Sequence, residues 1–407
     1  MAGETYVIVG AGQAGGRAAE TLREEGFAGR IVLLGAEPER PYERPPLSKG
    51  YLLGATALER IYLQPAPFYA EQDIELLLGQ AATAVLAREH IIELSSGQQL
   101  AYDTLLFTAG VRPRALPVPG AELPGIHTLR TIHDAMALAA AFAQQPRVLI
   151  VGAGFIGAEV AAACRVRGLP VTMLEALAVP LQAALGEQLG AVFAAIHRDA
   201  GVDLRLNSTV TAFRGTDRVA EAVLASGDVV PCDLVLIAIG CVPNVEPLAH
   251  SGVRLEHGVL VDEYCRTNVP GIFAAGDVAR WWHPALGEYL RVEHWDNAEQ
   301  QGSAAARAML GTLEPYAPVP YFWSDQYDYA LQYLGHRRGD EQQVVRGSLE
   351  GRAFTVFYLR ADVPVAALIL NRPRDGVPVR RLIAARTPVD PAILADESAD
   401  LRVLTRR

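Results

Sequence analysis

The chain has 407 residues, of which half are hydrophobic and a fifth are charged, and its formal net charge is −10. This length suits two or three globular domains, and the acidic balance argues against a nucleic-acid partner, because affinity for phosphates comes mostly from clustered cations. Since the longest apolar runs fall well short of the roughly 18 residues of a membrane span and no leader-like stretch precedes the first predicted strand, we expect a cytoplasmic protein with no membrane or nucleic-acid partner.

The first predicted module is a strand, a glycine-rich turn and a helix in residues 6–26, YVIVGAGQAGGRAAETLREEG. This is the context that a G-x-G-x-x-G dinucleotide fingerprint requires. Gly10 makes the tight turn, Gly12 lets the backbone approach a pyrophosphate, and Gly15 allows close helix–strand packing. Glu37, at the end of the next apolar run, can accept a hydrogen bond from a ribose hydroxyl.

Residues 40–50, RPYERPPLSKG, hold the only lysine of the chain, beside 35 arginines elsewhere. A leftover surface residue would explain a lone cation, and this segment alone does not decide the matter. A guanidinium is wide and planar, whereas an ammonium is a compact point charge on a flexible stem. A narrow site could therefore accept Lys49 and exclude an arginine.

The first module is repeated in residues 148–168, VLIVGAGFIGAEVAAACRVRG. Gly152, Gly154 and Gly157 repeat the three glycine roles, and Glu175 ends the next strand as Glu37 does in the first copy. No arginine lies near Glu175 to take a 2′-phosphate, so the sequence favours NADH over NADPH. Two matched copies indicate two dinucleotide-binding domains, and two dinucleotides in one chain suggest a flavin and a nicotinamide.

Composition marks the domain boundaries. Residues 112–125 are rich in proline and glycine and indicate a crossing between domains, while residues 240–244 indicate the return. After residues 316–321, alternating apolar and polar residues predict antiparallel strands. The first domain is therefore expected to be discontinuous, with the second module inserted into it.

The cysteines form neither a C-x-x-C pair nor a metal-ligand spacing, and the histidines form no cluster, so no metal site is predicted. We expect each cysteine to be a small buried hydrophobe; they are Cys164, Cys232, Cys241 and Cys265.

Several segments carry a family resemblance. Residues 271–279, GIFAAGDVA, resemble a segment of the flavoprotein reductases that bind two dinucleotides. More specifically, the chain is similar to the NADH:ferredoxin reductases of bacterial oxygenase systems over essentially its whole length. The motifs that carry this similarity are PYERPPLSK (41–49), GIHTLRT (125–131), RVEHWDNAEQQG (291–302) and YFWSDQY (321–327).

The resemblance implies an α/β fold with two Rossmann-like, glutathione-reductase-type domains and a C-terminal α+β domain. It also implies non-covalent FAD, NADH as hydride donor to FAD N5, and an acidic [2Fe–2S] ferredoxin that serves a cytochrome P450 or a Rieske-type oxygenase. The domains are then a discontinuous FAD-binding domain, an NADH-binding domain and a C-terminal domain: residues 1–113 with 244–320, residues 114–243, and residues 321–407.

Site residues follow from the same resemblance. Lys49 would lie beside the flavin ring and pair with Glu159, and Trp323 would lie between the flavin and the docking surface. The remaining FAD contacts would be Ala14, Arg44, Ala82, Arg130, Asp277 and Trp295, and the remaining NAD contacts Ile156 and Gly240. The family often has an acid where this chain has Ala36, so ribose recognition in the first domain depends on Glu37.

The electron acceptor is the main open question. Relatives that reduce disulfides or peroxides carry a reactive cysteine on the first domain, whereas the first cysteine here is Cys164. Electrons would then leave the flavin directly for an external acceptor. From Tyr321 onward, 13 arginines oppose 11 acids, which indicates either a solvated face or a docking surface for an acidic ferredoxin, with Arg337 and Arg338 as candidates. Two alternatives are a redox flavoprotein resembling apoptosis-inducing factor and a ferredoxin-independent NADH oxidase or diaphorase.

Overall fold

The computed structural model describes residues 3–405 and separates into two compact units. Unit 1 comprises Met1–Glu43, Leu58–Arg112 and Val242–Pro320, and unit 2 comprises Arg44–Ala57, Pro113–Cys241 and Tyr321–Arg407. No helix within residues 3–405 combines the length and apolar character needed to cross a membrane.

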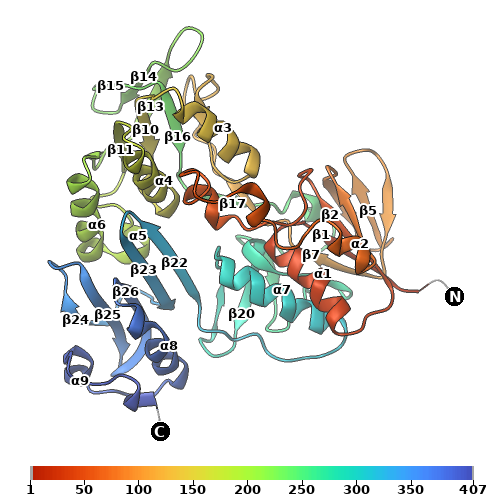
Figure 1. Ribbon diagram of the computed structural model, residues 1–407. Helices are drawn as coiled ribbons and strands as arrows, with labels where there is room; N and C mark the ends of the chain where they lie inside the picture. Colours follow the sequence, from red (N-terminus) through yellow and green to blue (C-terminus); the bar gives the residue numbers. More distant parts are fainter. Residues whose placement is uncertain (1–2, 406–407) are drawn as a thin grey trace. The chain divides into compact units, whose positions relative to one another are not determined.

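Unit 1 is built on a five-stranded parallel sheet in the order β19-β7-β1-β2-β3. Its inner strands β1, β2 and β7 are largely buried on both faces, which is why they are almost continuously apolar. Tyr6 and Ile8 face a layer that contains the two long helices of the unit, while Val7 and Val9 face the opposite layer. The strands are β1 (Thr5–Val9), β2 (Arg30–Gly35), β3 (Ile74–Leu78), β7 (Thr104–Phe107) and β19 (Ile272–Ala274); the helices are α1 (Gln13–Glu24) and α7 (Trp295–Met309) (Figure 1).

The opposite layer of unit 1 consists of two small three-stranded sheets. Trp281, at 1% exposure, and Tyr102, at 4%, fill the space beneath them. Their strands are β4 (Ala82–Leu86), β5 (Ile91–Leu94), β6 (Gln99–Ala101), β18 (Val259–Val261), β20 (Ala279–His283) and β21 (Glu288–Leu290). Shorter elements of the unit are η2 (Leu58–Arg60), α2 (Phe68–Glu71), η3 (Glu246–Leu248) and η4 (Gly276–Val278).

Unit 2 repeats the parallel sheet, in the order β12-β11-β10-β16-β9. The position of β10 between β11 and β16 matches that of β1 between β2 and β7, so the sequence repeat is also a repeat of topology. The elements are β9 (Ile126–His127), α3 (Ile132–Phe142), β10 (Val148–Val151), α4 (Phe155–Val166), β11 (Val171–Leu174), α5 (Gln182–Leu185), α6 (Glu187–Asp199), β12 (Asp203–Arg205), β13 (Val210–Arg214), β14 (Glu221–Leu224), β15 (Val229–Pro231) and β16 (Leu234–Ile237). The chain passes between the units in β8 (Val111–Pro113) and β17 (Cys241–Pro243).

The C-terminal part of unit 2 is a five-stranded antiparallel sheet in the order β22-β23-β26-β25-β24. Ala361 and Asp362 both have positive φ, which suits the tight turn between β25 and β26. The strands are β22 (Tyr321–Gln326), β23 (Tyr329–Gly335), β24 (Gln342–Ser348), β25 (Ala353–Arg360) and β26 (Val363–Leu370), followed by η5 (Pro373–Asp375), α8 (Gly376–Ala385), α9 (Pro391–Ala395) and η6 (Val403–Thr405). The predicted α/β class with a C-terminal α+β domain is confirmed.

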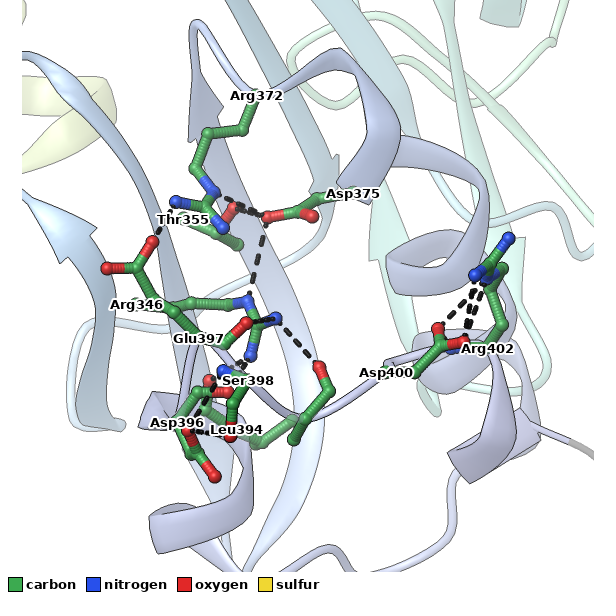
Figure 2. Close-up of polar contacts among 11 residues, drawn as sticks. Arg346, Thr355, Arg372, Asp375, Leu394, Asp396, Glu397, Ser398, Asp400 and Arg402 are labelled. Carbon is green, nitrogen blue, oxygen red and sulfur yellow. Dashed lines mark hydrogen bonds and ion pairs between the residues drawn. The ribbon is translucent and has the colours of Figure 1, made fainter.

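A buried arginine holds the end of the chain against this sheet, as Figure 2 shows. Arg346 on β24 is 5% exposed. Its guanidinium donates to the backbone carbonyls of four residues, one in the last turn of α9 and three just after this helix. Those four are Leu394, Asp396, Glu397 and Ala399. Nearby, the buried carboxylate of Asp375 accepts hydrogen bonds from Thr355 and Arg372. The final segment is thus fixed by one cation that satisfies several carbonyls.

Residues 44–57, which the sequence analysis assigned to the FAD-binding domain, pack with unit 2. They begin with η1 (Pro45–Ser48), which follows a proline pair, and they bury Leu47 and Leu52. Arg167, just after α4, donates to the backbone carbonyl of Leu52 at 2.6 Å. The assignment of cofactors to domains remains a prediction, but this segment carries Lys49 into unit 2.

Candidate active site

The glycine-rich turn of unit 1 closes tightly on the end of β7. A side chain at Gly10, which has φ +118°, would place its Cβ 2.2 Å from the carbonyl oxygen of Thr108, and one at Gly15 would place it 1.9 Å from the carbonyl oxygen of Gly10. A Cβ at Gly12, by contrast, would meet nothing within 4 Å. Gly12 is the N-cap of α1 and supplies no side chain to cap the helix. Helix N–H groups beside open space fit a phosphate.

The turn of unit 2 has the same geometry. A Cβ at Gly152 would lie 2.4 Å from the carbonyl oxygen of Ala238, one at Gly157 would lie 2.1 Å from that of Gly152, and one at Gly154 would meet nothing within 4 Å. Gly154 likewise begins α4 without a side-chain cap. Each unit therefore contains one cradle that fits a pyrophosphate.

The acids after the two second strands are held differently. In unit 2, the Glu175 carboxylate accepts hydrogen bonds from the backbone N–H groups of Ala153, at 2.8 Å, and Leu177, at 2.9 Å. In unit 1, Glu37 accepts from the phenol of Tyr42 at 2.6 Å. A carboxylate offers about four lone-pair sites, so Glu175 keeps the capacity to accept ribose hydroxyls while it stays fixed beside its cradle.

Further polar groups lie close to the cradle of unit 1. Gly276, which precedes Asp277 in η4, has φ +79° and donates its N–H to Gln301 Oε1 at 2.9 Å. The amide nitrogen of Gln301 is buried without a hydrogen-bond partner, and a buried donor of this kind fits a polar cofactor chain. Gln301 lies in the RVEHWDNAEQQG motif, yet sequence reasoning did not select it.

Helices α1 and α7 approach each other closely at this cradle. A Cβ at Gly302 would lie 2.4 Å from the backbone oxygen of Ala14, so Ala14 marks the contact between the helices. Trp295 begins α7, directly after its N-cap His294, and burial lowers the pKa of His294 to about 4. Ala82 begins β4 in the opposite layer.

The other predicted contacts belong to unit 2. Arg44 donates to the backbone oxygen of Arg130 at 2.6 Å, so the structure brings these two residues together. Ile156, in the first turn of α4, is 41% exposed, which suits a surface that a cofactor covers. Gly240 has φ +94°, and a Cβ there would meet nothing within 4 Å.

The lone lysine forms a partly buried ion pair. Lys49 Nζ lies 2.8 Å from Glu159 Oε2, with the lysine side chain 18% exposed and that of the glutamate 4%. Two hydroxyl groups also donate to this carboxylate: Ser48 to Oε2 at 2.5 Å and Ser324 to Oε1 at 2.7 Å. Sequence reasoning missed both serines, although they lie within the quoted motifs PYERPPLSK and YFWSDQY. Three donors thus converge on one buried carboxylate.

Three of the four thiols are buried, as expected, whereas Cys241 is only half-buried, so the prediction of a buried hydrophobe is wrong for Cys241. Burial raises the pKa of Cys164 and of Cys232 to about 12, and it raises the pKa of Cys265 as well. The thiolate is the reactive form of cysteine, so these groups are poor nucleophiles. None of the four cysteines forms a disulfide.

The predicted docking residues belong to the C-terminal part of unit 2: Trp323 is on β22, whereas Arg337 and Arg338 lie in the loop between β23 and β24. Along β22 the side chains alternate, with Phe322 packed in the core and Trp323 on the other face, where its ring stacks on Tyr321 at 6.1 Å. Arg337 lies over the buried ring of Tyr358 at 5.2 Å. The backbone N–H of the exposed Arg338 donates to Glu341.

Comparison with known proteins is consistent with this geometry. The family model described as pyridine nucleotide-disulphide oxidoreductase matches residues 4–302, and the model described as reductase C-terminal matches residues 321–405. The match to the first model covers both cradles, and the match to the second begins at the first residue of β22.

Similar proteins extend over nearly the whole chain. Rhodocoxin reductase of Rhodococcus erythropolis is 39% identical, covering 99% of this chain and 95% of its own. The 5,5'-dehydrodivanillate O-demethylase ferredoxin reductase subunit of Sphingobium sp. is 42% identical, covering 98% of both chains. The solved covalent putidaredoxin reductase–putidaredoxin complex has a TM-score of 0.95 at 35% identity, covering 99% of this chain and 98% of the matched one. The chain therefore belongs to the pyridine nucleotide-disulphide oxidoreductase family, among its ferredoxin reductases.

Proposed function

We propose that this protein passes electrons from NADH, through FAD, to an acidic [2Fe–2S] ferredoxin that serves a cytochrome P450 or a Rieske-type oxygenase. The observation that carries the proposal is the presence of two equivalent dinucleotide cradles in one chain, at Gly12 and Gly154. Near full-length similarity to ferredoxin reductases supports the choice of acceptor. Burial raises the pKa of the Cys164, Cys232 and Cys265 thiols, which argues against a disulfide between these residues as an intermediate carrier.

The reaction must convert a two-electron donor into two one-electron steps. NADH releases two electrons and one proton as a hydride, whereas each [2Fe–2S] ferredoxin accepts one electron, so one NADH reduces two ferredoxins and releases one proton. Bound FAD supplies the chemistry that accepts a hydride and gives up electrons singly, and the protein contributes binding, orientation and electrostatics.

Glu175 supports NADH rather than NADPH as the donor. Its carboxylate is fixed by two backbone N–H groups and would repel a 2′-phosphate. Arg205, on the neighbouring strand β12, is paired with Asp203 at 2.9 Å. The guanidinium of Arg205 is thus paired with Asp203 and not with a group beside Glu175.

Lys49 and Glu159 are the residues that we propose to act on the flavin. Glu159 holds the ammonium at a fixed position, and the ammonium would stabilise the negative charge that develops on the ring during reduction. Arg44, Arg130, Asp277 and Trp295 would position the rest of FAD. Trp323, Arg337 and Arg338 would face the ferredoxin, whose negative charge matches the arginine excess of the C-terminal region.

We further propose a cytoplasmic location. Four free cysteines and no disulfide are typical of a reducing compartment. NADH is also a reductant of that compartment.

The function is tested with purified protein. The protein should be yellow, NADH should bleach it without oxygen, and cytochrome c should be reduced only when a [2Fe–2S] ferredoxin is added. One ferredoxin of the P450 type and one of the Rieske type should be compared. Rapid oxygen consumption with NADH alone would instead indicate an NADH oxidase. A flavoprotein that NADH bleaches but that reduces neither ferredoxin would overturn the choice of acceptor.

A further inference from the structure

A chain of polar side chains leads from the carboxylate of Glu159 into the core of unit 2. Ser324 donates to Glu159 Oε1 at 2.7 Å, and Gln326 Nε2 donates to Ser324 Oγ at 3.2 Å. The other end of the Gln326 amide, Oε1, lies 3.1 Å from His197 Nε2, and Tyr327 places its hydroxyl 3.0 Å from His197 Nδ1. Ser324 and Gln326 are each 1% exposed and His197 is fully buried, so water does not satisfy these groups.

The direction of every hydrogen bond in this chain follows from the first one. Ser324 donates its single proton to Glu159, so its oxygen must accept from Gln326. The amide oxygen of Gln326 then faces His197, whose Nε2 must carry a proton. Burial lowers the pKa of His197 to about 4, so the ring is neutral near pH 7 and its Nδ1 accepts from Tyr327.

This series of hydrogen bonds therefore has a single polarity, with each donor directed toward Glu159. Hydrogen bonds in such a series polarise one another and strengthen the last bond of the series. Glu159 is 4% exposed, and without these donors its charge would be balanced mainly by Lys49 and Ser48. A carboxylate that depends on one cation draws that cation onto itself and reduces its effect on other groups.

We propose that Ser324, Gln326 and His197 are positioning residues that fix the carboxylate of Glu159 and stabilise its charge, so that the ammonium of Lys49 stays available to the flavin. The inference rests on the proposed function, because it assigns these residues a part in flavin reduction. None of them acts on the cofactor itself. Their effect passes through Glu159, and they contribute no proton to the reaction.

The state of His197 can be tested directly. In the holoprotein labelled with ¹⁵N-histidine, the imidazole signals of His197 are assigned by their loss in His197→Gln. At pH 7 they should show a protonated Nε2 and an unprotonated Nδ1. A proton on Nδ1 and none on Nε2 would reverse the direction of these hydrogen bonds and overturn the inference.

The consequence for the flavin is tested with a matched pair of variants. Ser324→Ala removes the hydroxyl that donates to Glu159, whereas Thr355→Val removes an equally buried hydroxyl that donates to Asp375 at 2.8 Å in the same sheet. At pH 8, the midpoint potential of bound FAD should become more negative in Ser324→Ala. The rate constant for its reduction by NADH should fall about tenfold, since a hydrogen bond to a charged group is lost, while the KM for NADH stays unchanged. Thr355→Val should change none of these quantities.

Two further variants guard against a purely structural explanation. Tyr327→Phe removes the most distant donor without changing the shape of the ring, so its effect on the potential should have the same sign and be smaller. Ser324→Cys keeps a weak donor of similar size and should restore part of the loss. An unchanged potential in Ser324→Ala, or an equal change in Thr355→Val, would overturn the inference. A wild-type flavoprotein that reduces no ferredoxin would overturn the proposed function instead, and these measurements would still decide the role of Ser324.

Discussion

At the scale of single residues, the choice between lysine and arginine matters most at position 49. The ammonium lies 2.8 Å from a carboxylate oxygen of Glu159 and 3.5 Å from the backbone oxygen of Pro45. Its side chain is only 18% exposed. Since the other 35 of the 36 lysine and arginine residues are arginine, general surface charge does not account for a lysine here. A compact ammonium fits between two oxygens where a planar guanidinium requires more room.

Replacing Lys49 tests this explanation. Lys49→Arg keeps the charge but moves it, so flavin reduction by NADH should slow by about tenfold or more, and Lys49→Ala should slow it at least as much. The FAD content of both variants should match that of wild type. Anaerobic stopped-flow measurement of flavin bleaching gives the rates. Equal rates in all three proteins would show that neither the charge nor the shape of residue 49 contributes.

Glu175 is the residue that should set the choice of nicotinamide cofactor. Glu175→Gln keeps an oxygen that can accept from ribose but removes the negative charge that opposes a 2′-phosphate. The ratio of kcat/KM for NADH to that for NADPH should fall about tenfold, as expected for the loss of a repulsion of about 1.4 kcal/mol. The KM for NADH should rise only a few fold. Steady-state kinetics with ferricyanide as acceptor measures kcat/KM for each cofactor and the KM for NADH. An unchanged ratio of the two kcat/KM values would contradict this role.

At the scale of elements, sequence reasoning works where the information is local. The sequence predicts tight turns at Gly10 and Gly152, and both residues have positive φ and close backbone neighbours. This prediction succeeds because all the residues that determine the turn lie within six positions of one another. The packing of residues 44–57 with unit 2 could not be predicted in the same way. Nor could the approach of Ser324 to Glu159, since the two residues are 165 positions apart. A serine has no periodic pattern that indicates which carboxylate it will meet.

Arg346 is another element-scale feature that the sequence did not indicate, and it should contribute strongly to stability. Arg346→Ala leaves four backbone carbonyls of the last segment without their donor and leaves Asp375 without a cation 3.9 Å away. We expect the free energy of unfolding of the C-terminal region to fall by about 3 kcal/mol. Urea unfolding followed by hydrogen exchange would measure it.

Arg402 provides the control for this prediction. It pairs with Asp400 in the same part of the chain (Figure 2), but its side chain is 73% exposed. Arg402→Ala should leave the unfolding midpoint unchanged, since exposed ion pairs contribute little. Similar losses in both variants would mean that removal of any arginine, rather than burial of Arg346, weakens this region.

At the scale of the whole molecule, each unit contains a parallel sheet, a dinucleotide cradle and one buried histidine with a strongly lowered pKa. These histidines are His294 in unit 1 and His197 in unit 2, and burial lowers the pKa of each to about 4. A neutral imidazole in the folded state and a protonated one in the unfolded state make stability depend on pH. Both units should therefore lose stability over the same range of pH.

The sign of this dependence is fixed by the direction of the shift. The unfolded chain binds protons to these rings below about pH 6.5, whereas the folded protein binds them only near pH 4, so stability falls as the pH decreases between these values. For His197 alone the loss at pH 5 is about 2 kcal/mol relative to pH 7.5. Thermal unfolding midpoints measured from pH 7.5 to 5 should therefore decline more steeply for wild type than for His197→Gln. Above pH 7.5 the two curves should run parallel, because the ring is then neutral in both states. Curves that stay parallel down to pH 5 would show that folding does not lower the pKa of His197, and this prediction would then be wrong.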